Sequence, residues 1–251
     1  MTIRLDVSSK SCLRDTQIER VPTGIAGFDE MIEGGIPAGR TIIVIGGPGT
    51  GKTIFCAQFL NHGITKYGQK GLYVSLEERR SHLYREMCRF NWNLVKHEKE
   101  GKLAFIDATP SSGRGAIPFR SLEQVLREIL RIAAEIHVQR IAVDGIASLL
   151  FEFPNLLDRR RAILRLVNAL SDTGATTVLT NELSIANNGR PVQLEEYLTH
   201  GTVILQTLDD GSSSVRALQI EKMRETTVDP KFTPYLITSS GIEVLFRRPI
   251  K

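Results

Sequence analysis

The glycine-rich segment GGPGTGKT at residues 46–53 constrains the fold of this chain more than any other feature. A β-branched run at 41–45 precedes this segment, and an amphipathic stretch at 54–66 follows it. Glycines let backbone N–H groups approach an anion closely, and the first turn of a helix carries a partial positive charge. The pattern GxxxxGK[ST] between a strand and a helix therefore predicts a phosphate-binding P-loop in an α/β fold.

The residue types in this segment also predict its ligands. Lys52 supplies a positive charge for the β- and γ-phosphates of a nucleotide, and the Thr53 hydroxyl is a ligand for Mg²⁺. The sequence therefore predicts ATP and Mg²⁺ as cofactors. The residues expected to bind the nucleotide are Gly46, Gly47, Pro48, Gly49, Thr50, Gly51, Lys52 and Thr53.

A second candidate is Asp144, which ends the apolar run RIAVD at 140–144. A carboxylate at the end of a buried strand holds Mg²⁺, directly or through a water, in many P-loop proteins. Aspartates at strand ends are also common in turns, so the run alone leaves both interpretations open. The P-loop upstream favours the metal role.

A third candidate is the pair Glu77 and Glu78, in the sequence SLEE at 75–78 that ends the next predicted strand. A carboxylate at this position can polarise the water that attacks a phosphate. Acidic residues are also favoured in the first turn of a helix by the helix dipole. Spacing alone does not decide between these two roles.

The whole chain alternates short β-branched runs with longer amphipathic stretches, which predicts a mostly parallel central sheet flanked by helices. After residue 200 the pattern changes to paired strand-like runs joined by turn residues, which predicts an antiparallel C-terminal extension. The predicted strands are 41–45, 71–76, 103–107, 140–144, 175–180, 202–208, 214–222, 235–238 and 241–245, and the predicted helices are 54–66, 81–90, 122–135 and 159–173.

Composition fits one folded domain at residues 21–246, preceded by a flexible arm at 1–20 and followed by a basic tail at 247–251. The chain has 41% apolar and 24% charged residues and a formal net charge of +4, which neither requires nor excludes nucleic acid. Its three cysteines form no CxxC pattern. No apolar run is long enough to span a bilayer. These features predict a cytoplasmic protein without a membrane partner.

Several motifs in a fixed order give the chain a resemblance to a single KaiC-type domain of the RecA-like ATPases. The resemblance covers residues 21–245, and its motifs include the P-loop and the glutamate pair already described. The others are TGIAGFDE at 23–30, GGIPAG at 34–39, RRAILRLV at 160–167, GATTVLTNE at 174–182, KMR at 222–224 and TSSGIEV at 238–244.

The resemblance implies a RecA-like core, a ring of six subunits that hold ATP between neighbours, and regulation of an unidentified partner protein. It also implies slow ATP hydrolysis, with Lys52 as a phosphate-binding residue and Glu77 as the principal catalytic carboxylate. Lys222 and Arg224 lie two apart in a strand-like run, so their side chains should project from the same face. Spacing alone equally fits a charged edge strand. The match to the family favours a role for this pair at the neighbouring subunit's γ-phosphate.

Departures from the family pattern narrow the expected activity. Circadian KaiC proteins carry two such domains, whereas this chain has the length of one. In the autokinase domain of the family an adjacent Ser–Thr pair accepts phosphate, and those positions are Tyr197 and Leu198 here. The sequence therefore resembles the ATPase-only domain, and we expect no autokinase activity.

Two alternatives remain open at this stage. The first is a recombinase-related ATPase that binds DNA through the segments 148–155 and 182–196, in which Arg190 is the only cation; its best support is the arginine run at 159–161. The second is a scaffold that senses ATP with little turnover.

Overall fold

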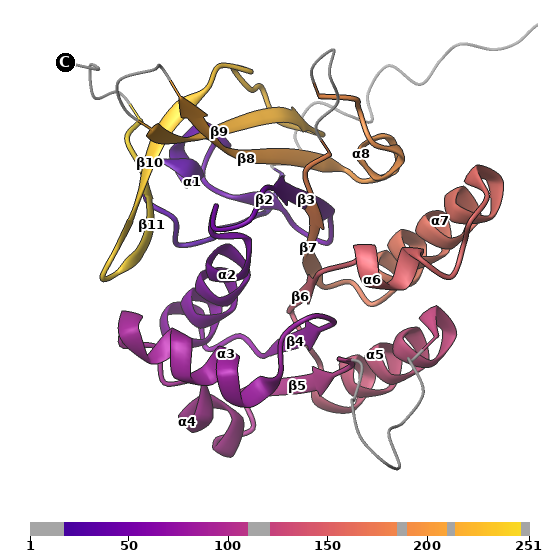
Figure 1. Ribbon diagram of the computed structural model, residues 1–251. Coiled ribbons are helices and arrows are strands. Elements are labelled where there is room, and N and C mark those ends of the chain that lie inside the picture. Colours follow the sequence, from indigo (N-terminus) through magenta and orange to yellow (C-terminus); the bar gives the residue numbers. More distant parts are fainter. Residues whose placement is uncertain (1–17, 110–120, 185–189, 210–213, 247–251) are drawn as a thin grey trace, which may run out of the picture.

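A computed structural model of the chain describes residues 18–109, 121–184, 190–209 and 214–246. Within these residues, nine strands form one twisted sheet in the order β11-β10-β9-β8-β3-β7-β6-β4-β5 (Figure 1). Its parallel part consists of β3 (Thr41–Gly46), β4 (Gly71–Ser75), β5 (Leu103–Asp107), β6 (Arg140–Asp144), β7 (Thr176–Glu182) and β8 (Gly201–Asp209).

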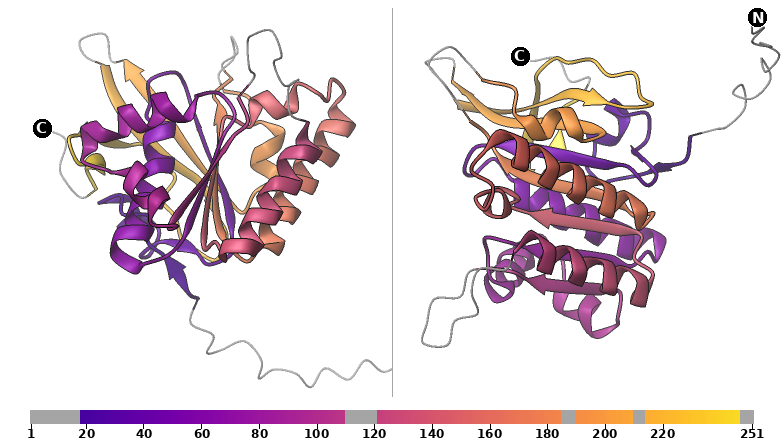
Figure 2. Two further views of the ribbon diagram at one scale, coloured as in Figure 1. Left: turned by 90° about the horizontal axis from the view of Figure 1, so that it is seen from below. Right: turned by 90° about the vertical axis from the view of Figure 1, so that its right-hand side faces the viewer.

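Helices cover both faces of this sheet, as Figure 2 shows in its left view. The parallel strands are almost continuous apolar runs, which is typical of strands buried on both faces. One face carries α2 (Lys52–Tyr67), α3 (Arg80–Met87) and α4 (Leu94–Lys99), and the other carries α5 (Leu122–Ile136) and α7 (Leu156–Asp172). The predicted α/β architecture is confirmed.

The C-terminal strands form the predicted antiparallel extension at one side of the sheet. Strand β8 lies parallel to β3, and β9 (Ser214–Met223), β10 (Thr233–Thr238) and β11 (Gly241–Val244) then continue antiparallel. Thr202 pairs with Lys222 and Val203 pairs with Ile220, so Glu221 is the extra residue of a β-bulge in β9.

Local sequence signals explain where the longer helices begin. Ser121 and Gln124 form a capping box at the start of α5, and the Asn155 side chain accepts a hydrogen bond from the Asp158 N–H at the start of α7. Helix α7 therefore begins at Leu156, three residues before the predicted start. The predicted helix at 81–90 is α3 followed by a 3₁₀ turn, Cys88–Phe90.

The pattern of the sequence did not indicate several short elements. These are β1 (Arg20–Val21), β2 (Ile36–Pro37), α1 (Phe28–Met31), α6 (Ala147–Leu150) and α8 (Leu194–Leu198), together with α4. Arg20, the last residue of the predicted arm, lies in β1 and donates hydrogen bonds to the carbonyl of Ile32 and to Thr226. Residues 1–17 of the predicted arm and the predicted tail at 247–251 lie outside the described residues.

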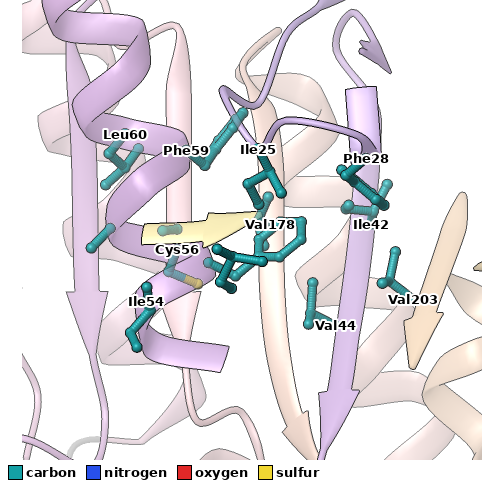
Figure 3. Close-up of a cluster of buried hydrophobic side chains, with 14 of the residues drawn as sticks. Ile25, Phe28, Ile42, Val44, Ile54, Cys56, Phe59, Leu60, Val178 and Val203 are labelled. Atoms are coloured by element: carbon teal, nitrogen blue, oxygen red, sulfur yellow. The ribbon is translucent and has the colours of Figure 1, made fainter. Parts of the chain in front are cut away.

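Alternate residues of β3 fill two separate cores. Ile42 and Val44 pack toward α2, in the cluster that Figure 3 draws, whereas Ile43 and Ile45 pack toward α5 and α7. In the same close-up Phe28 lies beside Ile42, and Cys56 and Phe59 of α2 face the sheet. This packing on both sides fixes β3, and with it the start of the glycine-rich loop.

We expect the variant Arg140→Met to lower the free energy of unfolding by about 2–5 kcal/mol, as measured by urea denaturation. Arg140 is 1% exposed and lies over the Phe59 ring, with 4.7 Å from Cζ to the ring centroid. Its guanidinium donates hydrogen bonds to the carbonyls of Pro22 (2.7 Å) and Phe59 (2.8 Å). Methionine would leave the buried Phe59 carbonyl and the partly buried Pro22 carbonyl without this donor, and an unsatisfied buried group costs about 1–3 kcal/mol.

The matched control is Arg131→Met on α5. Arg131 pairs with Glu135, but both side chains are more than half exposed, so its loss should change the stability by less than about 1 kcal/mol. Equal losses of stability in the two variants would contradict the role given to Arg140.

Candidate functional site

The glycine-rich loop lies at the carboxyl end of β3, between Gly46 and the start of α2 at Lys52. Gly49 and Gly51 have φ angles of 72° and 95°, which residues with a Cβ rarely adopt. The Lys52 Nζ donates hydrogen bonds to the carbonyls of Gly46 (2.8 Å) and Gly47 (3.1 Å), so its charge lies over the loop. The local geometry is that of a P-loop.

Neighbouring groups hold this loop in shape. The Thr50 hydroxyl donates to the Gly47 carbonyl over 2.8 Å, and the Tyr235 hydroxyl of β10 donates to the Thr50 carbonyl over 2.5 Å. Thr50 is buried, and Tyr235 is 1% exposed. The C-terminal extension therefore supports the loop from outside the parallel part of the sheet.

A cleft of about 490 Å³ opens beside the loop and brings together six of the thirteen predicted site residues, namely Gly49, Gly51, Lys52, Thr53, Glu77 and Asp144. Lys52 and Thr53 line it from α2, Glu77 from the end of β4, and Asp144 from the end of β6. Carboxyl ends of neighbouring parallel strands meet at one edge of a sheet, where ligands of open α/β folds bind. The arrangement matches what phosphate and metal binding require.

Asp144 is 8% exposed, and hydroxyl groups hold both of its carboxylate oxygens. The Tyr73 hydroxyl donates to Oδ2 over 2.7 Å, and the Thr180 hydroxyl donates to Oδ1 over 2.6 Å. Burial raises the pKa of Tyr73 well above its usual value, and the nearby Asp144 carboxylate raises it further. The phenol therefore stays a proton donor, and the two hydroxyl groups fix the orientation of the Asp144 carboxyl group.

Glu77 and Glu78 have different surroundings. Glu77 lines the cleft, and its side chain lies against Gly145, where a Cβ would come within 2.5 Å of the Glu77 Cδ. Burial raises the pKa of the Glu77 carboxyl, the carboxylates of Asp144 and Glu182 raise it further, and Lys52 opposes them. Glu78 is outside the described lining of the cleft. Burial also raises the pKa of the Glu78 carboxyl. The place of Glu77 in the lining of the cleft is therefore what distinguishes it as the candidate general base.

Lys222 and Arg224 lie at the other end of the strands. Lys222 pairs with Thr202, which pairs with Ile43 near the start of β3, whereas the P-loop follows the end of β3. The Lys222 Nζ donates to the carbonyls of Glu196 (2.6 Å) and Thr199 (2.7 Å). Arg224 is exposed. This pair therefore does not join the cleft of its own chain.

Several residues around the cleft were not predicted from the sequence. Arg89 and Glu86 reach it from the α3 side, and Arg216 reaches it from β9. Strand β8 ends and β9 begins at the P-loop end of the sheet, so an early residue of β9 lies there. This was the only signal for Arg216. For Tyr73 the signal was a hydroxyl-bearing aromatic residue in the middle of a fully buried strand.

A family model described as the KaiC ATPase matches residues 21–248. The chain belongs to the KaiC ATPase family. This membership and the RecA-like fold confirm the resemblance inferred from the motifs. In the described part of the chain, no helix combines the length and the apolar character that crossing a membrane requires.

The relatives that match this chain differ in length: some are about as long as this chain, and others are about twice as long. A UPF0273 protein of Methanocaldococcus jannaschii is 35% identical over 236 residues, which cover 90% of this chain and 96% of that protein. A crystal structure of a KaiC-like protein from the hyperthermophilic archaeon Pyrococcus horikoshii matches with a TM-score of 0.79 and 37% identity, covering 91% of this chain and 99% of that one.

The circadian clock oscillator protein KaiC of Parasynechococcus marenigrum is 32% identical over 234 residues, which cover 91% of this chain. The same alignment covers 45% of the clock protein. This chain therefore spans about half the length of the clock proteins that it matches.

Proposed function

We propose that this KaiC-family chain is a Mg²⁺-dependent ATPase that hydrolyses ATP slowly in a ring of subunits and regulates a partner protein. The observation that carries the proposal is that Lys52, Thr53, Glu77 and Asp144 line one cleft next to a P-loop. A cation for phosphates, two oxygen ligands for a metal and a carboxylate base are the groups that this reaction needs.

The residues present fit both ATP and Mg²⁺. The P-loop offers backbone N–H groups at the start of α2 to the phosphates, and Lys52 adds its charge. Thr53 and Asp144 offer the hydroxyl and carboxylate oxygens that Mg²⁺ prefers. Held by these residues, Mg²⁺ would neutralise the charge that develops on the phosphate oxygens during the reaction.

Glu77 is our choice for the group that orients the attacking water and accepts its proton. It lines the cleft together with Lys52 and Asp144, and Gly145 leaves room for its side chain. Glu78 lies outside this lining and contributes to the reaction indirectly, through its charge. Its backbone N–H donates a hydrogen bond to the Ser75 hydroxyl.

The positions of two predicted groups at opposite ends of the strands support the proposed ring assembly. Each subunit has a P-loop at the carboxyl end of β3 and the pair Lys222 and Arg224 near its amino-terminal end. Head-to-tail association of identical chains closes into a ring when the rotation between neighbours permits it. We propose six subunits, with Lys222 and Arg224 acting on the γ-phosphate bound by the neighbour.

The DNA-binding alternative has less support. In the arginine run that supported it, Arg159 pairs with Glu195 over 3.5 Å and Arg161 with Asp158 over 3.2 Å. Arg190, the only cation in the two candidate segments, pairs with Glu196 over 2.6 Å. Nucleic-acid binding requires cations that are available for phosphates.

We also expect no autokinase activity, so long incubation with ATP should yield no stable phosphoprotein by mass spectrometry.

Purified protein is expected to release phosphate from ATP when Mg²⁺ is present and to stop when EDTA removes it. Size-exclusion chromatography with light scattering, with and without ATP and Mg²⁺, would measure the oligomer in the same samples. Phosphate release should co-elute with a particle of about six chain masses. Nucleotide binding without phosphate release would instead support the ATP-sensing scaffold, and salt-dependent binding of single-stranded DNA would support the recombinase-related alternative.

A further inference from the structure

Tyr73 is a polar group in the core for which the proposed reaction gives no role. It is 1% exposed in the middle of β4, and its hydroxyl donates to Oδ2 of Asp144. We propose that Tyr73 is a positioning residue that orients the Asp144 carboxylate and so sets how tightly the site binds a divalent cation. This inference rests on the proposed metal role of Asp144.

The pairing of β4 with β6 brings the two side chains together. Tyr73 pairs with Ala142 and Ser75 pairs with Asp144, so Tyr73 is the diagonal neighbour of Asp144 on the same face of the sheet. A diagonal neighbour is about 7–8 Å away between backbones, within reach of an aromatic side chain. Ala142, directly opposite Tyr73, is small and leaves the ring room to extend toward Asp144.

Packing fixes the ring from the other side. Tyr73 stacks on Phe105 of β5, with ring centroids 5.4 Å apart and planes inclined by 7°. The ring therefore has little freedom, and its hydroxyl is held at the carboxylate. A fixed donor of this kind determines where the lone pairs of the carboxylate point.

The Tyr73 and Thr180 hydroxyls together hold Asp144 from the two neighbouring strands. Thr180 Oγ1 also accepts the N–H of Gly145, so the Thr180 contact is itself held in place. With a hydroxyl on each oxygen, rotation of the carboxylate about χ2 breaks at least one hydrogen bond. Removing the Tyr73 hydroxyl leaves the Thr180 contact, so the metal site should weaken and not disappear. Loss of such a partner typically costs about 10–100-fold in metal affinity or activity.

The test is Tyr73→Phe, which removes the hydroxyl and keeps the ring against Phe105. Mn²⁺, a spectroscopic substitute for Mg²⁺, is titrated into protein that holds a non-hydrolysable ATP analogue and is followed by electron paramagnetic resonance. We expect the dissociation constant of Mn²⁺ to rise about tenfold or more. Affinity for the analogue in EDTA should be unchanged, which also shows that the variant is folded.

The matched control is Tyr84→Phe. Tyr84 is also a buried tyrosine in ring contact with Phe105, but its hydroxyl donates to Glu98 over 3.1 Å, away from the cleft. Its Mn²⁺ affinity should equal that of the wild type. Equal Mn²⁺ affinities in Tyr73→Phe and Tyr84→Phe, with a weakened Asp144→Asn, would overturn the positioning role alone. Unchanged Mn²⁺ affinity in Asp144→Asn would overturn the metal role of Asp144 and this inference with it.

Discussion

Glu77→Gln is expected to leave ATP binding intact and to slow ATP hydrolysis by about 10²–10⁴-fold, the usual contribution of a general base. Glutamine has nearly the same shape as glutamate, so it fits the space above Gly145, but its amide cannot accept a proton from water. Binding of a fluorescent ATP analogue and single-turnover phosphate release would measure the two effects separately. The protein should then hold ATP as a stable complex.

The neighbouring variant Glu78→Gln is the control for Glu77→Gln. It removes a charge one residue away, outside the described lining of the cleft, so we expect a change of less than about tenfold. If Glu78→Gln carries the whole defect, the roles of the two glutamates are reversed. If the double variant hydrolyses ATP at the wild-type rate, neither carboxylate takes part in the reaction.

The sequence predicted the main strands and helices well, because the spacing of their apolar residues matches the faces that the fold buries. Strand β3 is an example: each of its residues is buried, and alternate side chains enter the two cores. Short elements were missed for the opposite reason. Helix α8 has five residues, and two glutamates in it are buried: Glu195 against Arg159 of α7, and Glu196 against Arg190, which precedes the helix. Such a helix depends on tertiary contacts and not on a periodic pattern.

The candidate site was predictable where one motif contains it and unpredictable where the fold assembles it. The P-loop segment predicts its own backbone conformation, because glycines at this spacing before a helix are typical of a phosphate-binding loop. Arg216, in contrast, reaches the cleft only because β9 begins at the P-loop end of the sheet. Tyr73 contacts Asp144 only through the pairing of β4 with β6, which local sequence does not encode.

The largest expected effect on ATP turnover is that of removing Arg224, which lies at the opposite end of the strands from the P-loop. Arg224→Ala should lower ATP turnover by about 10³–10⁵-fold, because an arginine supplied in trans stabilises charge on the transferring phosphoryl group. ATP binding should change much less, since the P-loop and Lys52 of the other subunit remain intact. Lys52→Ala should abolish productive ATP binding in its own subunit, because it removes the charge beside the loop. Each variant alone is therefore expected to be inactive for a different reason.

Mixing the two inactive variants in one ring tests whether Arg224 acts across the subunit boundary. An interface with intact Lys52 from one subunit and intact Arg224 from the next should hydrolyse ATP, so random mixing at equal amounts should restore about one quarter of the wild-type activity. Lys52→Ala mixed with Glu77→Gln is the control, because both residues line the cleft of one chain and no mixed interface combines them. Mixed Lys52→Ala and Arg224→Ala rings that assemble but stay inactive at every ratio would show that Arg224 does not act in trans.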